Sequence, residues 1–198
     1  MNHYFNPSEN LGHKEKEIEY IHKFTTFYFI TDTGVFSKDK VDSATDILLN
    51  NLPVLSGEVL DLGCGYGCAG IALAKIYGEN ISVTMSDINR RAVDLAIKNA
   101  KKNGVAVKAV CSDGFTNISE HFGAIIFNPP IHAGKEAVYK MYEDAYIHLE
   151  TGGRFFIVIQ KKHGAKSHRQ KLETIFKAEN SCVAYSKKGF FVFEFKKI

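Results

Sequence analysis

Residues 59–67 read Val59-Leu60-Asp61-Leu62-Gly63-Cys64-Gly65-Tyr66-Gly67, and this stretch decides the fold. An apolar strand pattern runs into glycines at every second position, and a helical pattern follows over residues 68–77. Because glycine has no Cβ, a ligand can approach the backbone of such a loop closely. The start of the helix offers unpaired N–H groups and a positive dipole end to a phosphate or a carboxylate. The stretch therefore predicts a strand, loop and helix that bind a small molecule.

Strand patterns alternate with helical patterns on both sides of this loop. The predicted strands are 58–62, which leads into the loop, and 82–87, 106–111, 123–128 and 154–160. Besides the helix over 68–77, the predicted helices are 90–103, 135–149 and 165–176. We expect Gly152-Gly153 to end the helix over 135–149. This alternation predicts an α/β fold, a mostly parallel sheet with helices on both faces.

The end of the chain departs from the alternation. Two strand patterns, 181–186 and 190–195, are separated only by Lys187-Lys188-Gly189. So short a link cannot carry a crossover, so the two strands must form an antiparallel hairpin. At the other end, residues 1–50 contain two short strand patterns, 18–22 and 25–30, and a helical pattern over 41–50. No linker follows, and we expect one domain over 1–198, with 1–50 packed on a catalytic core of 51–198.

The ligand predicted for the glycine loop is S-adenosylmethionine. Gly65, Gly67 and Gly70 also satisfy the G-x-G-x-x-G pattern of dinucleotide-binding proteins, which leaves an NAD-dependent oxidoreductase as a rival. Asp61, at the strand end ahead of the glycines, separates the two ligands. Its carboxylate would repel a pyrophosphate and would attract the cationic amino and sulfonium groups of S-adenosylmethionine.

Further contacts to this cofactor follow from the ends of the next strands. An acid at Asp87 can accept both hydroxyls of an adenosine ribose, and Ile88 can cover one face of the adenine. Asp113-Gly114 is either an acceptor for the adenine amine or an ordinary turn pair. The predicted cofactor-binding residues are Asp61, Gly63, Cys64, Gly65, Gly67, Asp87, Ile88, Asp113, Gly114 and Asn128.

The predicted catalytic residues are Asn128, Pro129 and Pro130, at the end of the fourth strand of the alternating part. Ligands bind beyond the carboxyl ends of parallel strands, so this motif should meet the glycine loop at one edge of the sheet. Two prolines hold the backbone rigid and present the Asn128 side-chain oxygen and the Pro129 carbonyl as acceptors. Two acceptors suit an exocyclic amine, whose lone pair becomes available when both hydrogens are bound and whose developing positive charge meets fixed dipoles.

Together these residues resemble Rossmann-like class I methyltransferases, and more narrowly the methyltransferase small-domain family, which includes the small-subunit 16S rRNA guanine-N2 methyltransferases. The resemblance covers roughly residues 30–198 and includes Thr33-Gly34-Val35-Phe36-Ser37 and Asn128-Pro129-Pro130-Ile131-His132. It implies a seven-stranded sheet in the order 3-2-1-4-5-7-6 and methylation of an amino nitrogen.

Ile131 departs from the family pattern, which usually has Phe or Tyr after the two prolines to stack on the target base. Tyr66, Phe36 or His132 could supply the ring instead. The longer rRNA enzymes of this family also carry a second, N-terminal domain, which we do not expect in these 198 residues, so target recognition is expected from residues 1–40 and the basic end. The predicted substrate-binding residues are Phe36, Ile131, His132, Lys135, Lys161 and Lys162.

Composition and charge limit the kinds of partner that the protein is expected to bind. No apolar run approaches the roughly 20 residues of a membrane helix, and the polar N-terminus lacks a signal peptide, so we expect a cytoplasmic protein without membrane contact. The four cysteines, at 64, 68, 111 and 182, have no partner pair that completes a zinc site, so no metal is expected. Residues 154–198 hold 11 Lys and Arg against 3 Asp and Glu, which indicates either a polyanionic partner or a solvated surface.

The leading hypothesis is an S-adenosylmethionine-dependent N-methyltransferase that acts on guanine N2 of small-subunit rRNA, as RNA or in a ribosomal particle. Adenine N6 and the glutamine side chain of a protein are alternative acceptors. A non-catalytic RNA-binding or assembly module on the same fold is a hypothesis of another class.

Overall fold

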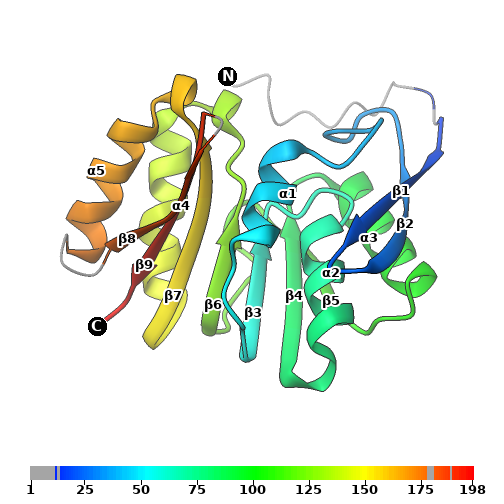
Figure 1. Ribbon diagram of the computed structural model, residues 1–198, viewed down its shortest axis with the longest axis horizontal. Helices are drawn as coiled ribbons and strands as arrows, with labels where there is room; N and C mark the ends of the chain where they lie inside the picture. Colours follow the sequence, from blue (N-terminus) through cyan, green and yellow to red (C-terminus); the bar gives the residue numbers. More distant parts are fainter. Residues whose placement is uncertain (1–11, 13, 178–180, 188) are drawn as a thin grey trace.

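The structure is a computed structural model that describes residues 12, 14–177, 181–187 and 189–198 of the 198-residue chain. Its main feature is a seven-stranded sheet in the order β5-β4-β3-β6-β7-β9-β8 (Figure 1). Counted from β3, this is the predicted order 3-2-1-4-5-7-6. The strands are β3 (Gly57–Leu62), β4 (Ile81–Asp87), β5 (Lys108–Cys111), β6 (Phe122–Phe127), β7 (Leu149–Gln160), β8 (Ser181–Lys187) and β9 (Phe190–Lys196).

The first five of these strands run in the same direction, and β9 runs opposite to both of its neighbours. β3 pairs with β4 and β6, β4 with β5, and β6 with β7, all in parallel register. β9 pairs antiparallel with both β7 and β8. The terminal hairpin expected from the short link is therefore confirmed, although Lys188 of that link lies outside the described residues.

Helices cover both faces of the sheet, as predicted. They are α1 (Ser43–Asn50), α2 (Cys68–Tyr77), α3 (Arg90–Lys102), α4 (Lys135–His148) and α5 (Ala165–Phe176). Neighbouring residues of a strand belong to different cores: Val59 packs with α1, α2 and α3, whereas Leu60 packs with α4 and α5. Side chains alternate between the two faces of a strand, so strands buried on both faces are apolar throughout.

The N-terminal strands form a separate two-stranded antiparallel sheet of β1 (Lys16–His22) and β2 (Thr25–Thr31). This hairpin lies beside α2 and α3 (Figure 1). Phe27 and Phe29 are fully buried on its inner face, and the Phe29 ring contacts the Tyr66 ring at 5.7 Å between centroids. The hairpin thus adds to the same core as β3, α2 and α3.

Two element boundaries correct the sequence predictions. Gly152-Gly153 do not end a helix but lie inside β7, because α4 ends at His148 and β7 begins at Leu149. The pairing of β6 with β7 shifts register between Phe122 and Ala124, and a Cβ on Gly153 would lie 3.0 Å from the Phe122 carbonyl oxygen. Glycine is therefore needed for close backbone approach at a strand irregularity. The predicted strand 106–111 begins only at Lys108.

The parallel register brings the carboxyl ends of β3, β4, β6 and β7 to one edge of the sheet. The glycine loop follows β3 there, Asp87 ends β4, and Asn128 follows β6. Within the described part of the chain, no helix is both long and apolar enough to cross a membrane.

Candidate functional site

A cavity of about 600 Å³ opens at this edge of the sheet. It is lined by most of the predicted site residues, namely Phe36, Asp61, Gly63, Cys64, Gly65, Asp87, Ile88, Gly114, Asn128, Pro129, Pro130, Ile131 and His132. The fold therefore joins the glycine loop and the Asn-Pro-Pro motif in one space. The predicted residues Gly67, Asp113, Lys135, Lys161 and Lys162 do not line it.

The glycine loop has a left-handed backbone at its alternate positions, with φ of +67° at Gly63, +56° at Gly65 and +90° at Gly67. L side chains are strained in this region, which explains the glycines. Gly65 lines the cavity, and a Cβ there would meet no protein atom within 4 Å. At Gly67 a Cβ would lie 2.9 Å from Ile71 Cδ1 and 3.0 Å from Ala96 Cβ, so this glycine lets α2 pack against α3.

Asp61 lies at the base of the cavity, where β3 meets α2. Its Oδ2 accepts a hydrogen bond of 2.8 Å from the Gly70 N–H. The carboxyl group is only 4% exposed, and burial raises its pKa to about 7, with Asp87 adding to the rise and the Gly70 hydrogen bond opposing it. A carboxyl group so placed gains most from a cation that enters the cavity and favours its ionised form.

Asp87 presents a second carboxylate to the same side of the cavity. Its Oδ2 accepts from the Gly65 N–H at 2.9 Å, and its Oδ1 accepts from the Asn89 N–H at 2.8 Å. Burial raises the pKa of Asp87, while these backbone hydrogen bonds lower it. Two carboxylates and a glycine loop fit a ligand that carries cationic groups and hydroxyls better than they fit a pyrophosphate.

Asn128 lies opposite these acids, after β6. Its Nδ2 donates to Asp42 Oδ2 at 3.0 Å and to Thr45 Oγ1 at 3.1 Å. Asp42 is the N-cap of α1, and its Oδ2 also accepts from the N–H groups of Ala44 and Thr45. Sequence reasoning missed Asp42 and Thr45, because the helix was predicted from residue 41 and nothing local pairs its start with Asn128.

Phe36, at 67% exposed, is the most exposed Phe or Tyr side chain that lines the cavity, and the half-buried Phe190 lines it as well. Tyr66 also lines the cavity, but it is only 4% exposed and its ring packs on Phe29, so Phe36 and His132 are the more accessible of the three rings that the sequence suggested. Ile131 and His132 lie in a short 3-10 turn, Ile131–Ala133, and both line the cavity. The His132 ring lies 6.4 Å from the ring of His163, another lining residue.

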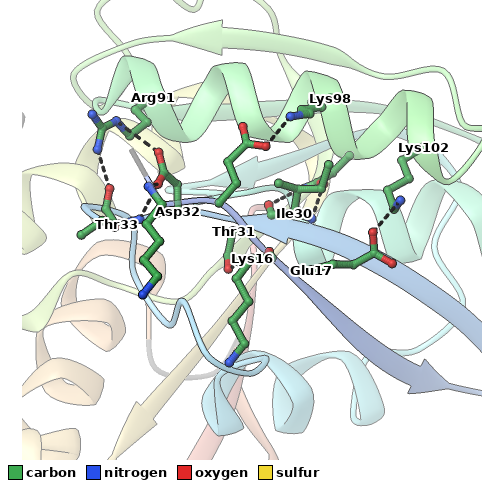
Figure 2. Close-up of polar contacts among 12 residues, drawn as sticks. Lys16, Glu17, Ile30, Thr31, Asp32, Thr33, Arg91, Lys98 and Lys102 are labelled. Carbon is green, nitrogen blue, oxygen red and sulfur yellow. Dashed lines mark hydrogen bonds and ion pairs between the residues drawn. The ribbon is translucent and has the colours of Figure 1, made fainter. Parts of the chain in front are cut away.

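The segment that carries Phe36 is held by the start of α3. Asn89 Nδ2 donates to the Gly34 carbonyl at 3.1 Å, and Arg91 donates to the Thr33 carbonyl and pairs with the buried Asp32 (Figure 2). Asn89 is also the N-cap of α3, where its Oδ1 accepts from the Arg91 N–H at 3.0 Å. Its contact with Gly34 depends on the packing of the hairpin.

The remaining predicted residues lie around the cavity rather than in it. Asp113 is exposed, between the lining residues Ser112 and Gly114. Lys135 begins α4, and Lys161 and Lys162 lie in the 3-10 turn Lys161–His163 after β7. All three lysines are exposed. Among the residues that the structure describes, no three His, Cys, Asp or Glu side chains gather as metal ligands.

Comparison with known proteins gives a consistent result. The sequence model of one protein family, the methyltransferase small domain, matches residues 26–194. The uncharacterised protein YbxB of Bacillus subtilis is 37% identical over 201 residues, which cover 99% of this chain and 98% of YbxB. Ribosomal RNA small subunit methyltransferase C of Actinobacillus pleuropneumoniae is 40% identical over 132 residues, which cover 63% of this chain and 40% of that enzyme.

A solved structure shares the fold over nearly the whole chain. It is the T. thermophilus 16S rRNA N2 G1207 methyltransferase (RsmC) in complex with AdoMet and guanosine, with a TM-score of 0.83 and 25% identity. The match covers 93% of this chain and 51% of that one, so the chain spans about half the length of this enzyme. The chain belongs to the methyltransferase small-domain family, a family of S-adenosylmethionine-dependent methyltransferases.

Proposed function

We propose that this protein transfers a methyl group from S-adenosylmethionine to an exocyclic amino nitrogen, and that its acceptor is guanine N2 of small-subunit rRNA. One observation carries the proposal: Asn128-Pro129-Pro130 lines the same cavity as Asp61, Gly65 and Asp87. A methyl donor and an amino acceptor can therefore be held together.

The acidic side of the cavity would hold the cofactor. Gly63 and Gly65 allow close approach to the backbone, Asp61 faces the cationic end, and Asp87 can accept from the ribose hydroxyls. S-adenosylmethionine supplies, when bound, a methyl group on a positively charged sulfur that leaves as a neutral thioether. The chain's task on this side is to bind and orient, because alignment of the reacting atoms lowers the barrier substantially.

The Asn-Pro-Pro side would hold the amine. The Asn128 side-chain oxygen and the Pro129 carbonyl accept its two hydrogens, which frees the nitrogen lone pair to form the new N–C bond. As that bond forms the C–S bond breaks, and the electron pair stays on sulfur. The two oxygens stabilise the positive charge that develops on nitrogen, and the surplus proton then leaves to solvent.

The RNA target is supported by the relatives and by charge. Two of them are methyltransferases of small-subunit rRNA, one of them acting at guanine N2, and this chain spans only part of each. Exposed Lys135, Lys161 and Lys162 lie close in the chain to the lining residues Ala133, Gln160 and His163, and they suit contacts with a phosphate backbone.

The test is methyl transfer from radiolabelled S-adenosylmethionine to small ribosomal subunits and to deproteinised 16S rRNA, both from cells that lack the protein. Nucleoside analysis should show N2-methylguanosine. N6-methyladenosine, or label in a glutamine side chain, would move the acceptor to one of the alternatives. Cofactor binding without transfer to any acceptor would support a non-catalytic module, and absence of cofactor binding in calorimetry would refute the methyltransferase.

A further inference from the structure

Asp42 joins the start of α1 to the Asn-Pro-Pro turn, although it lies 86 residues from Asn128 in the sequence. Its Oδ2 accepts three hydrogen bonds: from the Ala44 N–H at 3.0 Å, from the Thr45 N–H at 3.3 Å and from Asn128 Nδ2 at 3.0 Å. The carboxylate is half-buried, and it lines the same cavity as Asn128. One oxygen thus fixes both a helix start and a side-chain amide.

This contact determines which end of the Asn128 amide faces the cavity. An ionised carboxylate accepts hydrogen bonds but cannot donate them, so the amide must turn its NH₂ group to Asp42. Thr45 Oγ1 accepts from the same NH₂ group at 3.1 Å. Both acceptors lie on the side of α1, and the amide oxygen of Asn128 is left for a group in the cavity.

We infer that Asp42 is a positioning residue that holds Asn128 as a hydrogen-bond acceptor and thereby selects an amino group as the methyl acceptor. An amino group donates to the fixed oxygen, whereas a carbonyl oxygen or an unprotonated ring nitrogen would meet it lone pair to lone pair. The inference rests on the proposed function, because it takes Asn128 to bind the target amine.

The charge of Asp42 adds a second effect. Hydrogen bonds in a chain polarise one another. A carboxylate bound to the NH₂ group therefore increases the negative charge on the Asn128 oxygen, which opposes the positive charge developing on the target nitrogen. Asp42 acts through Asn128 in both effects.

The test exchanges the residue types of the Asp42–Asn128 pair. Asn128→Asp alone sets two carboxylates about 3 Å apart, which repel each other at neutral pH. Asp42→Asn added to it restores a donor and an acceptor, with the direction of the hydrogen bond reversed. One oxygen of Asp42 accepts both from the start of α1 and from Asn128, so an asparagine in its place that donates its NH₂ group to a carboxylate at position 128 gives up the cap at that atom. The matched control is Asp39→Asn, which removes an exposed carboxylate that pairs with Lys16.

Three measurements are made on the full chain: unfolding in urea without ligands, S-adenosylmethionine binding by calorimetry, and methyl transfer. Asn128→Asp should lower the urea midpoint and reduce kcat by on the order of 100-fold. The double variant should recover part of the midpoint, because the α1 cap is weakened while the pair is restored, and about tenfold of kcat relative to Asn128→Asp. Asp42→Asn alone should lower kcat with little change in KM. Cofactor affinity should stay within a fewfold in every variant, and Asp39→Asn should behave as wild type.

Additive effects would overturn the inference: a double variant no more stable and no more active than the two single changes predict. Unfolding is measured without substrate, so its coupling decides the Asp42–Asn128 contact even if the wild-type protein methylates no RNA. That last result would count against the proposed function alone. If the double variant and Asn128→Asp transfer methyl groups to RNA at the same rate, the proposed function is kept and the positioning role of Asp42 is refuted.

Discussion

Asn128 is the side chain to which the proposed function assigns the target amine. We predict that Asn128→Ala lowers kcat by about 100-fold or more, because one of the two oxygens that stabilise the charged nitrogen is lost. The affinity for S-adenosylmethionine should change only a fewfold, because the glycine loop and both acids remain. Single-turnover transfer and calorimetry measure the two quantities. Parallel loss of cofactor binding would show that Asn128 belongs to the cofactor side.

Asp61 makes cofactor binding depend on pH. Burial raises its pKa to about 7, so the carboxyl group of the free protein is largely neutral at lower pH and cannot attract a cation. We predict that the affinity for S-adenosylmethionine rises between about pH 5.5 and 7.5, with release of a proton on binding. Calorimetry in buffers of different ionisation enthalpy measures both. A pH-independent affinity would refute this role, and Asp61→Asn should flatten the profile.

The same pKa affects folding with the opposite sign. Between about pH 4 and 7 the folded protein keeps a proton on Asp61 that the unfolded chain has released. The contribution of Asp61 to the free energy of unfolding therefore falls as pH rises through this window. Asp61→Asn should remove that part of the pH dependence in urea unfolding without ligand.

At the scale of elements, Asn99 of α3 joins the N-terminal hairpin to the glycine loop. It is fully buried. Its Oδ1 accepts from the Ile30 N–H at 2.7 Å, and its Nδ2 donates to the carbonyls of Ile30 and Tyr66, each at 2.9 Å. Asn103, the C-cap of α3, makes similar bonds with the backbone of Tyr28, and α3 also forms the exposed ion pairs Lys102–Glu17, with β1, and Lys98–Glu15, with the residue before β1 (Figure 2).

We predict that Asn99→Ala lowers the free energy of unfolding by about 2–3 kcal/mol, because three backbone groups lose their partner at a buried position. Lys98→Ala, on the same helix, should cost less than about 1 kcal/mol, since exposed ion pairs contribute little. Urea unfolding of the two variants measures the difference. Equal effects would mean that water replaces the Asn99 contacts and that the hairpin is not held through them.

At the scale of the whole molecule, acidic and basic side chains occupy different places at the edge of the sheet that holds the cavity. The acids that suit the cofactor lie in the cavity, and the exposed Lys135, Lys161 and Lys162 lie close in the chain to residues that line it. We predict that Lys161→Ala with Lys162→Ala raises KM for RNA severalfold and reduces the salt slope of RNA binding by about 2, one for each phosphate contact.

Lys108→Ala is the matched control, because Lys108 is an exposed lysine at the amino end of β5, away from the cavity. It should leave RNA binding and its salt slope unchanged. Filter binding over a range of salt concentrations makes the comparison. Equal effects per charge removed would show that the basic residues act through net charge and that Lys161 and Lys162 contact no phosphate.

Local pattern was sufficient for much of the architecture. The apolar run before Gly63 predicts a buried strand, the helix over 68–77 is found with the predicted bounds, and the three-residue link before Phe190 requires a hairpin. Gly152-Gly153 misled the prediction, because glycine serves equally at a helix end and at a strand irregularity. Only the partner strand, with Phe122 against β7, distinguishes the two.

The candidate site also has one part that the sequence predicts and another that depends on tertiary packing. Gly63, Gly65, Asp61 and Asn128 were predictable, because loop conformation and the common edge of parallel strands follow from neighbouring residues and strand direction. The burial of Tyr66, the exposure of Phe36 and the hold of Asp42 on Asn128 were not. These depend on contacts between segments far apart in the chain, whose geometry exists only once the hairpin and α1 are packed. Residue types and their spacing thus indicate the glycine loop and the Asn-Pro-Pro motif of a methyltransferase, whereas tertiary packing decides which way the Asn128 amide points.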